Sequence, residues 1–301
     1  MRNKNIFVSI RKNHDVMDLV INRLEQIPKI DLTIHRPIKN IINIESIIDK
    51  LRNSDYLILK ASNKISIDIL QFAQMYKIPS LHSLNAVVTC LSKIALDGRL
   101  RQIIEKYNNR LRDFILPIPE SWTGVIKQNS LEEFKEWAKP NLPLVIKSHD
   151  QHDKNIRFSF RVRNLDEIDD FYNRFKTKLD YAVYIQKEIN CDDIDRKVYV
   201  IGDKTFGIQR ESPIVVSKRE NLDYINPDSI KKEQFDVPEK AKMIAKILSK
   251  ELDLKLFGFD LIKSADQEKY YLIDVNDFPG YRGIPNVHEI IVDFLKNLLK
   301  F

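Results

Sequence analysis

The stretch Leu256–Pro285, LFGFDLIKSADQEKYYLIDVNDFPGYRGIP, has the pattern of two β-strands joined by a polar turn. Alternate positions on each side of the turn are apolar: Phe257, Phe259 and Leu261 before it, and Tyr271, Ile273 and Val275 after it. If the turn centres on Gln267, Asp260 lies directly opposite Asp274. The sequence therefore predicts an antiparallel hairpin that carries two opposed carboxylates on one face.

Two carboxylates opposed across a strand pair repel each other unless a cation neutralises them. At ~4 Å this repulsion is about 4 kcal/mol for an effective dielectric constant near 20. Asp260, Asp274 and Asn276 form an oxygen-only donor set of the kind that suits Mg²⁺. Gly258, opposite Asn276, is expected to leave space for a ligand. We predict a metal site here, and the alternative is a solvated face on an edge hairpin.

Composition sets the class of protein. The chain has 301 residues, of which 43% are hydrophobic, as in a globular protein with two or three compact units. No apolar run approaches the ~18 residues of a membrane span, and the apolar part of the N-terminus is too short for a signal peptide. Cys90 and Cys191 give no metal or disulfide pattern, so we expect a cytoplasmic location. The net charge of +6 favours an anionic partner.

The order of expected strands and helices predicts an α/β (α+β) chain of three units. These units are residues 1–112, 113–184 and 185–301. The first alternates strand and helix, with a fourth strand at Pro79–His82 and a long helical stretch over Asn85–Arg112. It lacks G-x-G-x-x-G, so a Rossmann site is unsupported. In the third unit, Glu211–Asp236 has little periodicity and is predicted to contain a long loop.

Basic residues outside the hairpin are candidates for binding phosphate groups. Lys147 ends an apolar strand, where its compact charge can point at a phosphate, although an ordinary solvated lysine fits the same pattern. The loop His149–Asn155 has no glycine and so is not a P-loop. Lys197 and Arg210 are expected near the same end of a second hairpin. Two adjacent cations need either an anionic ligand or carboxylate partners.

Taken together, these features resemble the ATP-grasp superfamily and, within it, the inositol polyphosphate kinases of the inositol 1,3,4-trisphosphate 5/6-kinase type. The resemblance is most specific in Leu272–Tyr281, LIDVNDFPGY, which matches the pattern I-D-[IV]-N-x-F-P-G-Y of these kinases. The segment from Gln186 to Ser212 also fits without a gap. Residues 143–301 carry the resemblance well and residues 1–142 weakly. It implies an ATP-grasp fold with an N-terminal βαβ domain.

The resemblance also implies ATP and two Mg²⁺ ions as cofactors and an inositol phosphate as substrate. It assigns nucleotide contacts to Lys93, Lys147, Gln186, Lys187, Glu188, Ile189 and Ser212; metal ligands to Asp260, Asp274 and Asn276; and substrate contacts to Lys12, His152, Arg157, Lys197, Arg210, Asn276 and Gly280. Lys197 and Arg210 would stabilise charge on the transferred group. Arg157 stands where the family has a histidine, and an arginine cannot act as an acid or base near neutral pH.

We therefore predict a monomeric, ATP- and Mg²⁺-dependent kinase that phosphorylates a hydroxyl group of an inositol phosphate. Phosphoryl transfer needs positioning and charge neutralisation more than covalent chemistry. One alternative is an ATP-grasp carboxylate–amine ligase, against which the Phe-Pro-Gly-Tyr motif and the basic residues argue. Another is a basic nucleic-acid-binding protein, which needs aromatic side chains among basic ones on a surface. Because the aromatic residues have core spacing, no nucleic-acid partner is expected, and the lack of a long apolar run argues against a membrane partner.

Overall fold

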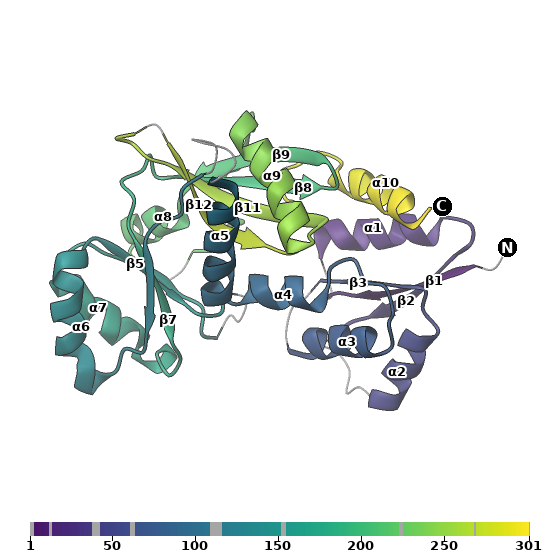
Figure 1. Cartoon of the computed structure of the whole chain (residues 1–301), viewed down its shortest axis with the longest axis horizontal. Helices are drawn as coiled ribbons and strands as arrows, with labels where there is room; N and C mark the ends of the chain where they lie inside the picture. Colours follow the sequence, from purple (N-terminus) through teal and green to yellow (C-terminus); the bar gives the residue numbers. More distant parts are fainter. Residues whose placement is uncertain are drawn as a thin grey trace.

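The computed structural model describes residues 3–11, 14–37, 43–60, 64–108, 116–151, 155–222, 225–267 and 269–300. The strands of this part of the chain form three sheets with helices packed around them (Figure 1). Four hydrophobic clusters hold these layers together. None of the helices described is long and apolar enough to cross a bilayer.

The N-terminal part forms a small parallel sheet, as its alternation of strands and helices predicts. Its elements are β1 (Lys4–Ser9), α1 (Asp15–Glu25), β2 (Ile30–His35), α2 (Ile44–Arg52), β3 (Tyr56–Leu59) and α3 (Lys64–Met75). Strand β1 lies between β2 and β3, and all three are parallel. The predicted fourth strand at Pro79–His82 is wrong, because Ser80 forms only an isolated bridge with Leu57.

The long helical stretch predicted after this sheet is two helices. They are α4 (Leu84–Leu91) and α5 (Lys93–Asn108). Ser92 separates them because its backbone is extended, with ψ at 110°. The break makes Lys93 the first residue of α5, where its side chain is buried. A local backbone change therefore sets the position of one predicted nucleotide ligand.

The central sheet is antiparallel, in the order β4-β7-β5-β6. Its elements are β4 (Ser121–Gly124), α6 (Leu131–Ala138), β5 (Leu144–Ser148), β6 (Ser159–Val162), α7 (Asp166–Phe175) and β7 (Val183–Lys187), with short 3₁₀ turns η1 (Gln128–Ser130), η2 (Lys139–Asn141) and η3 (Lys176–Lys178). Leu144 and Ile146 are buried in the core shared with α6 and α7, so Val145 and Lys147 face the other way. The boundary proposed between residues 184 and 185 falls within β7.

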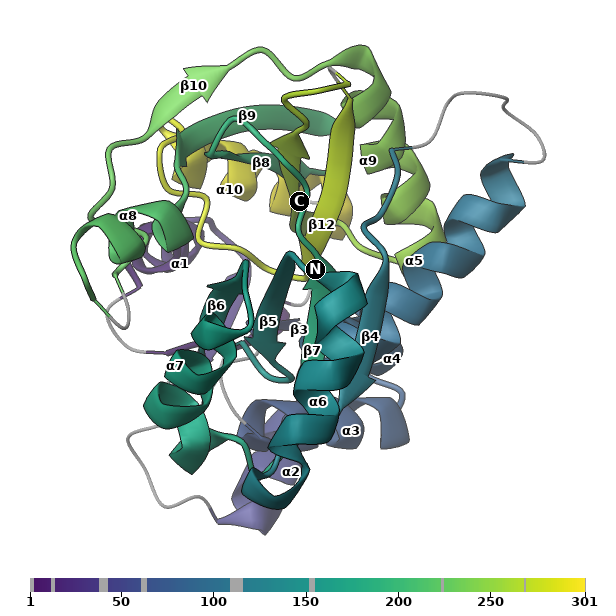
Figure 2. The same cartoon turned by 90° about the vertical axis from the view of Figure 1, so that its left-hand side faces the viewer.

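The C-terminal sheet is also antiparallel, in the order β10-β9-β8-β11-β12, and Figure 2 shows it above the central sheet. Its elements are β8 (Ile194–Ile201), β9 (Lys204–Glu211), α8 (Pro213–Arg219), β10 (Glu233–Phe235), α9 (Glu239–Leu252), β11 (Leu256–Lys263), β12 (Tyr270–Asn276) and α10 (Val287–Leu299). The segment Glu211–Asp236, predicted to contain a long loop, also holds α8 and the edge strand β10. Helix α10 packs against α1, so the first and last helices of the chain lie together (Figure 1).

The β11–β12 hairpin has the predicted register at the end away from the turn, where Asp260 lies opposite Asp274. One position further on, Leu261 pairs with Leu272, so Ile273 is left without a partner. This bulge shifts the alternation of β12. Leu272 is buried and Ile273 is half-buried, so the predicted apolar face of β12 is wrong beyond the bulge.

Candidate functional site

A row of charged side chains crosses three strands of the C-terminal sheet. Lys197 on β8 lies opposite Asp260 on β11, which lies opposite Asp274 on β12. The Lys197 Nζ is 2.9 Å from Asp260 Oδ1. Lys93, from the start of α5, donates to Asp274 Oδ1 at 2.5 Å. In this structure each carboxylate therefore has a lysine partner, and the row extends from the C-terminal sheet to helix α5 of the first unit.

The lysines keep Asp274 ionised. Burial alone would raise the pKa of Asp274, but the charge and hydrogen bond of Lys93, with the charges of Lys147 and Lys197, bring it below its usual value. Burial works against the charge of Lys197 as well, and Asp260 outweighs it, so the pKa of Lys197 is raised. Three lysines from three elements thus act on one carboxylate, and the group as a whole carries excess positive charge.

The donor atoms fit the expected metal. Asp260, Asp274 and Asn276 lie on one face of the hairpin, where their carboxylate and amide oxygens can serve as ligands. The Asn276 amide lies beside the carboxylates, with its Nδ2 3.4 Å from Asp274 Oδ2. Within the described ranges, no group of three or more His, Cys, Asp or Glu gathers for a metal ion. Such a small set suits Mg²⁺, which usually binds one or two carboxylates and completes its shell with water and phosphate oxygens.

Lys147 faces the same region from the central sheet. Its Nζ donates to Gln186 Oε1 on β7 at 2.6 Å. Burial lowers the pKa of Lys147, while Asp274 and Asp260 raise it. The lysine expected to bind phosphate is therefore held at the interior of the molecule, within electrostatic reach of the carboxylate pair.

The segment Gln186–Ile189, expected to hold adenine, already uses part of its main chain. The Lys187 N–H donates to Glu120 O and the Glu188 N–H to Pro143 O, at 2.8 and 2.9 Å. The Lys187 ammonium donates to the carbonyl groups of residues 141 and 142. Glu188 is paired with two arginines of β6 and the loop after it, and Ile189 is half-buried. Contacts with a base would have to use the remaining groups of this segment.

Arg210 lies opposite Asp195 on the β8–β9 pair, two positions from the partner of Lys197. Its Nη1 donates to the carbonyl of Pro227 at 2.8 Å. Burial raises the pKa of Asp195, against the opposing effects of Arg210 and a hydrogen bond from Ser212. Arg210 and Ser212 thus both interact with Asp195, which lies two residues before Lys197 on β8.

The two glycines of the site differ. A Cβ at Gly258 would lie 3.2 Å from Pro279 Cγ and 3.2 Å from Tyr199 Cδ1. The expectation that Gly258 leaves space for a ligand is therefore wrong, because protein atoms fill that space. A Cβ at Gly280 would meet nothing nearer than Arg282 Cγ at 4.0 Å, so protein packing does not require glycine there.

Three predicted substrate ligands are less well placed. Lys12 and His152 lie outside the described residues. Arg157 is half-buried and precedes β6, and its carbonyl accepts from Lys178 Nζ at 3.5 Å. Their roles remain predictions.

The structure adds a second basic cluster that sequence reasoning missed. Lys60 follows β3, and burial lowers its pKa to about 8, partly offset by Asp277. Arg11, Lys197 and Arg282 lie close enough to lower it further. Among the described residues, Arg11 Nε is buried without a hydrogen-bond partner. The signal was present: residues 57–60, LILK, repeat the strand-end pattern of residues 144–147, LVIK.

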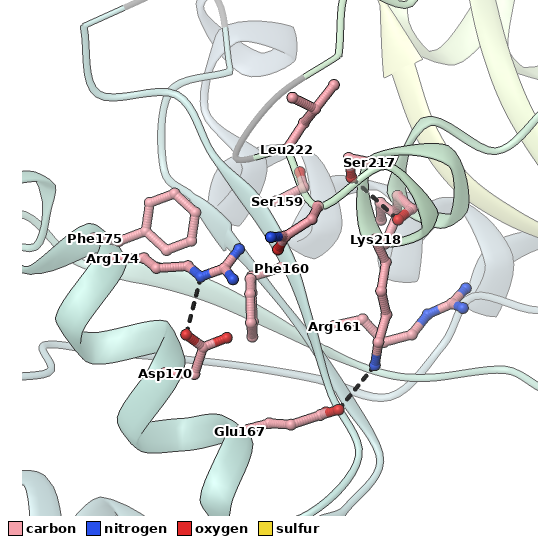
Figure 3. A pocket seen from close by; sticks show the side chains of 12 residues that line it. Ser159, Phe160, Arg161, Glu167, Asp170, Arg174, Phe175, Ser217, Lys218 and Leu222 are labelled. Carbon is pink, nitrogen blue, oxygen red and sulfur yellow. Dashed lines mark hydrogen bonds and ion pairs between the residues drawn. The ribbon is translucent and has the colours of Figure 1, made fainter.

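A cavity of about 230 Å³ lies at the edge strand β6, between α7 and α8 (Figure 3). Four of the charged side chains that line it form two ion pairs with each other. Lys218 Nζ is 2.8 Å from Glu167 Oε1, and Arg174 Nε is 2.9 Å from Asp170 Oδ1. The row of lysines and carboxylates contributes none of the residues that line this cavity. The row of lysines and carboxylates, and not this cavity, is therefore the candidate functional site.

Comparison with known proteins agrees with this geometry. Residues 214–297 match the model of the inositol 1,3,4-trisphosphate 5/6-kinase ATP-grasp domain. Inositol-tetrakisphosphate 1-kinase 1 of Arabidopsis thaliana is 25% identical over 140 residues, covering 39% of this chain and 44% of that protein. The Oryza sativa subsp. indica protein of the same name is 29% identical over 140 residues, covering 40% of each. The matched part is thus less than half the length of these relatives.

Solved structures match over nearly the whole chain. D-alanyl-alanine synthetase A from Vibrio cholerae aligns over 100% of both chains with a TM-score of 0.68 at 14% identity. D-alanine–D-alanine ligase from Bacillus anthracis aligns over 99% of this chain and 96% of that chain, with a TM-score of 0.66 at 15% identity. At these identities the likeness concerns the fold, and with the family match it confirms the predicted ATP-grasp architecture.

Proposed function

From an ATP-grasp fold whose C-terminal part resembles inositol phosphate kinases, we propose that this protein is an ATP- and Mg²⁺-dependent kinase. It transfers the γ-phosphoryl group of ATP to a hydroxyl group of an inositol phosphate. The observation that carries the proposal is the convergence of Lys93, Lys147 and Lys197 on Asp274. Positive charge in excess of the nearby carboxylates favours a polyanionic ligand.

The lysines divide between the two substrates. Lys147 and Lys93 approach from the central sheet and from α5, so they would neutralise the phosphates of ATP. Lys197 lies on the other side of the carboxylate pair, and both Lys197 and Arg11 are within electrostatic reach of Lys60. These three cations would hold the phosphates of the acceptor. Arg210 extends the same basic surface along β9.

The proposed phosphoryl transfer at Lys197, Asp260 and Asp274 depends on charge neutralisation. Asp260, Asp274 and Asn276 would hold Mg²⁺, which when bound would neutralise charge on the nucleotide phosphates. Lys197 would stabilise the negative charge that develops on the transferred group, since it lies directly beside Asp260. The pair with Lys93 keeps Asp274 ionised, and both lysine–carboxylate pairs hold their side chains in place when no ligand is bound.

A product assay tests the proposal. The protein is incubated with ATP, Mg²⁺ and each member of a panel of inositol phosphates, and ring-phosphorylated products are identified by ³¹P NMR. A Lys197→Ala variant should lose most of this activity. A Lys218→Ala variant is the matched control, because Lys218 forms an ion pair with Glu167 and is 56% exposed. No phosphorylated inositol with any acceptor would overturn the proposal.

The same assay separates the kinase from an ATP-grasp ligase. A carboxylate–amine ligase uses the same nucleotide site but releases ADP and inorganic phosphate only when both an amine and a carboxylate are present. Amino acids and short peptides are therefore included in the panel. Phosphate release that depends on such pairs would favour the ligase. The family match at residues 214–297 supports the kinase.

A further inference from the structure

A chain of buried hydrogen bonds runs from Lys147 to helix α5. Lys147 Nζ donates to Gln186 Oε1 at 2.6 Å, and Gln186 Nε2 donates to the Tyr184 hydroxyl at 2.8 Å. The Tyr184 hydroxyl donates to Asp97 Oδ2 at 2.6 Å. Gln186, Tyr184 and Asp97 are 3%, 5% and 9% exposed. These contacts form a continuous path through the interior, and each donor has one acceptor in a fixed direction.

Asp97 is the fixed end of this path. Arg101 Nε donates to Asp97 Oδ1 at 2.6 Å, and Ser121 Oγ donates to Asp97 Oδ2 at 2.9 Å. Arg101 is further held by the carbonyl of Pro119 at 2.9 Å. Asp97 lies one helical turn after Lys93, whose ammonium pairs with Asp274. One helix therefore positions Lys93 directly and is connected to Lys147 through the path.

The direction of the hydrogen bonds follows from the number of protons available. A tyrosine hydroxyl has one proton, which it donates to Asp97 Oδ2, so the hydroxyl oxygen must accept from the Gln186 amide nitrogen. Burial and Asp97 raise the pKa of Tyr184 far above its usual value, which keeps that proton on the hydroxyl. The amide oxygen of Gln186 is then turned toward Lys147. Without the hydroxyl the amide could rotate and present its N–H₂ group to the ammonium.

We propose that Asp97 and Tyr184 are positioning residues for Lys147. By fixing the orientation of the Gln186 amide, they hold the Lys147 ammonium where it meets the phosphates of the nucleotide. The inference rests on the proposed function, in which Lys147 is a phosphate ligand. It adds two residues that the sequence did not single out, one on α5 and one on β7.

A double-mutant cycle tests the proposal through nucleotide affinity. Calorimetric titration with ADP and Mg²⁺ measures Kd for wild type, Tyr184→Phe, Lys147→Met and the double variant. Tyr184→Phe should weaken ADP binding about fivefold when Lys147 is present, the size of a lost buried hydrogen bond. With methionine at position 147 the same change should alter Kd less than twofold, because there is no ammonium to position.

Thr123→Val is the matched control. Thr123 lies opposite Tyr184 on the neighbouring strand, but its hydroxyl donates to the carbonyl of Val183 and is outside the path. This variant should leave Kd unchanged. Asp97→Asn provides a second test if Tyr184→Phe folds poorly, because it removes the charge that orients the hydroxyl, and it should weaken ADP binding in the same Lys147-dependent way.

The outcomes are distinct. Equal losses of affinity in both backgrounds would overturn the positioning role, as would a lower Tm with an unchanged Kd. If wild-type protein binds no nucleotide at all, the proposed function fails and this inference fails with it. If nucleotide binds tightly and the cycle is additive, only the positioning role is wrong.

Discussion

Replacing Asp274 with asparagine should destabilise the ligand-free protein, although it removes one of two opposed carboxylates. Repulsion from Asp260, ~5 Å away for opposed residues, is about 3 kcal/mol at an effective dielectric constant near 20. On the same scale, attraction to Lys93 Nζ at 2.5 Å is about 7 kcal/mol. Asp274 is 20% exposed, so its replacement by a neutral amide also removes the cost of burying a charge, which offsets part of the lost attraction. We expect a free energy of unfolding about 2 kcal/mol lower than that of wild type.

Urea unfolding at pH 7 in EDTA, followed by circular dichroism, measures this difference. Asp170→Asn is the control, because it breaks an exposed ion pair with Arg174 and should change the free energy of unfolding by about 0.5 kcal/mol or less. Adding Lys93→Met to Asp274→Asn should cost little more than Asp274→Asn alone, since the pair is already broken. An Asp274→Asn protein more stable than wild type would show that repulsion dominates and would refute the role given to Lys93.

Three further predictions concern the acceptor and pH. Lys197→Ala should raise KM for the acceptor at least about tenfold while changing the Kd of ATP much less; equal losses would place Lys197 on the nucleotide. KM for the acceptor should rise as pH increases through about 8, where Lys60 loses its charge, and Lys60→Arg should flatten this profile; an unchanged profile would assign the titration to another group. Burial lowers the pKa of His82 to about 3, so below pH 6.5 the unfolded chain binds a proton that the native state excludes. The contribution of His82 to the free energy of unfolding should therefore fall by about 1.4 kcal/mol per pH unit between pH 6.5 and 3. The free energy of unfolding of His82→Gln should depend less steeply on pH than that of wild type, and an equal pH dependence of the two proteins would contradict this.

The features that could be predicted from sequence depend on short-range patterns. The period of two residues in β11 and β12, with a polar turn between them, was enough to place Asp260 opposite Asp274. The apolar run before Lys147 likewise placed a lysine at the end of a strand. Both inferences use residues within about fifteen positions of each other, where the geometry of a strand or hairpin limits the alternatives.

The features that could not be predicted depend on distant contacts or on single backbone changes. Lys93 meets Asp274 across 181 positions of sequence, and no local pattern indicates that partner. The bulge at Ile273 changes one register step, and residues 270–273, YYLI, are all apolar or aromatic, so the sequence does not mark where the alternation of β12 shifts. The break at Ser92 lies within a helical pattern, and the residue itself is compatible with a helix.

The measurement that tests the central claim most directly is transfer of the γ-phosphate of labelled ATP to an inositol phosphate, with Mg²⁺ and again in excess EDTA. The account predicts that label appears on the inositol ring with Mg²⁺, and that transfer is lost in EDTA and in Asp274→Asn. Transfer that persists in EDTA, or label that appears only as inorganic phosphate, would contradict a phosphoryl-transfer centre at Asp260, Asp274 and their lysines.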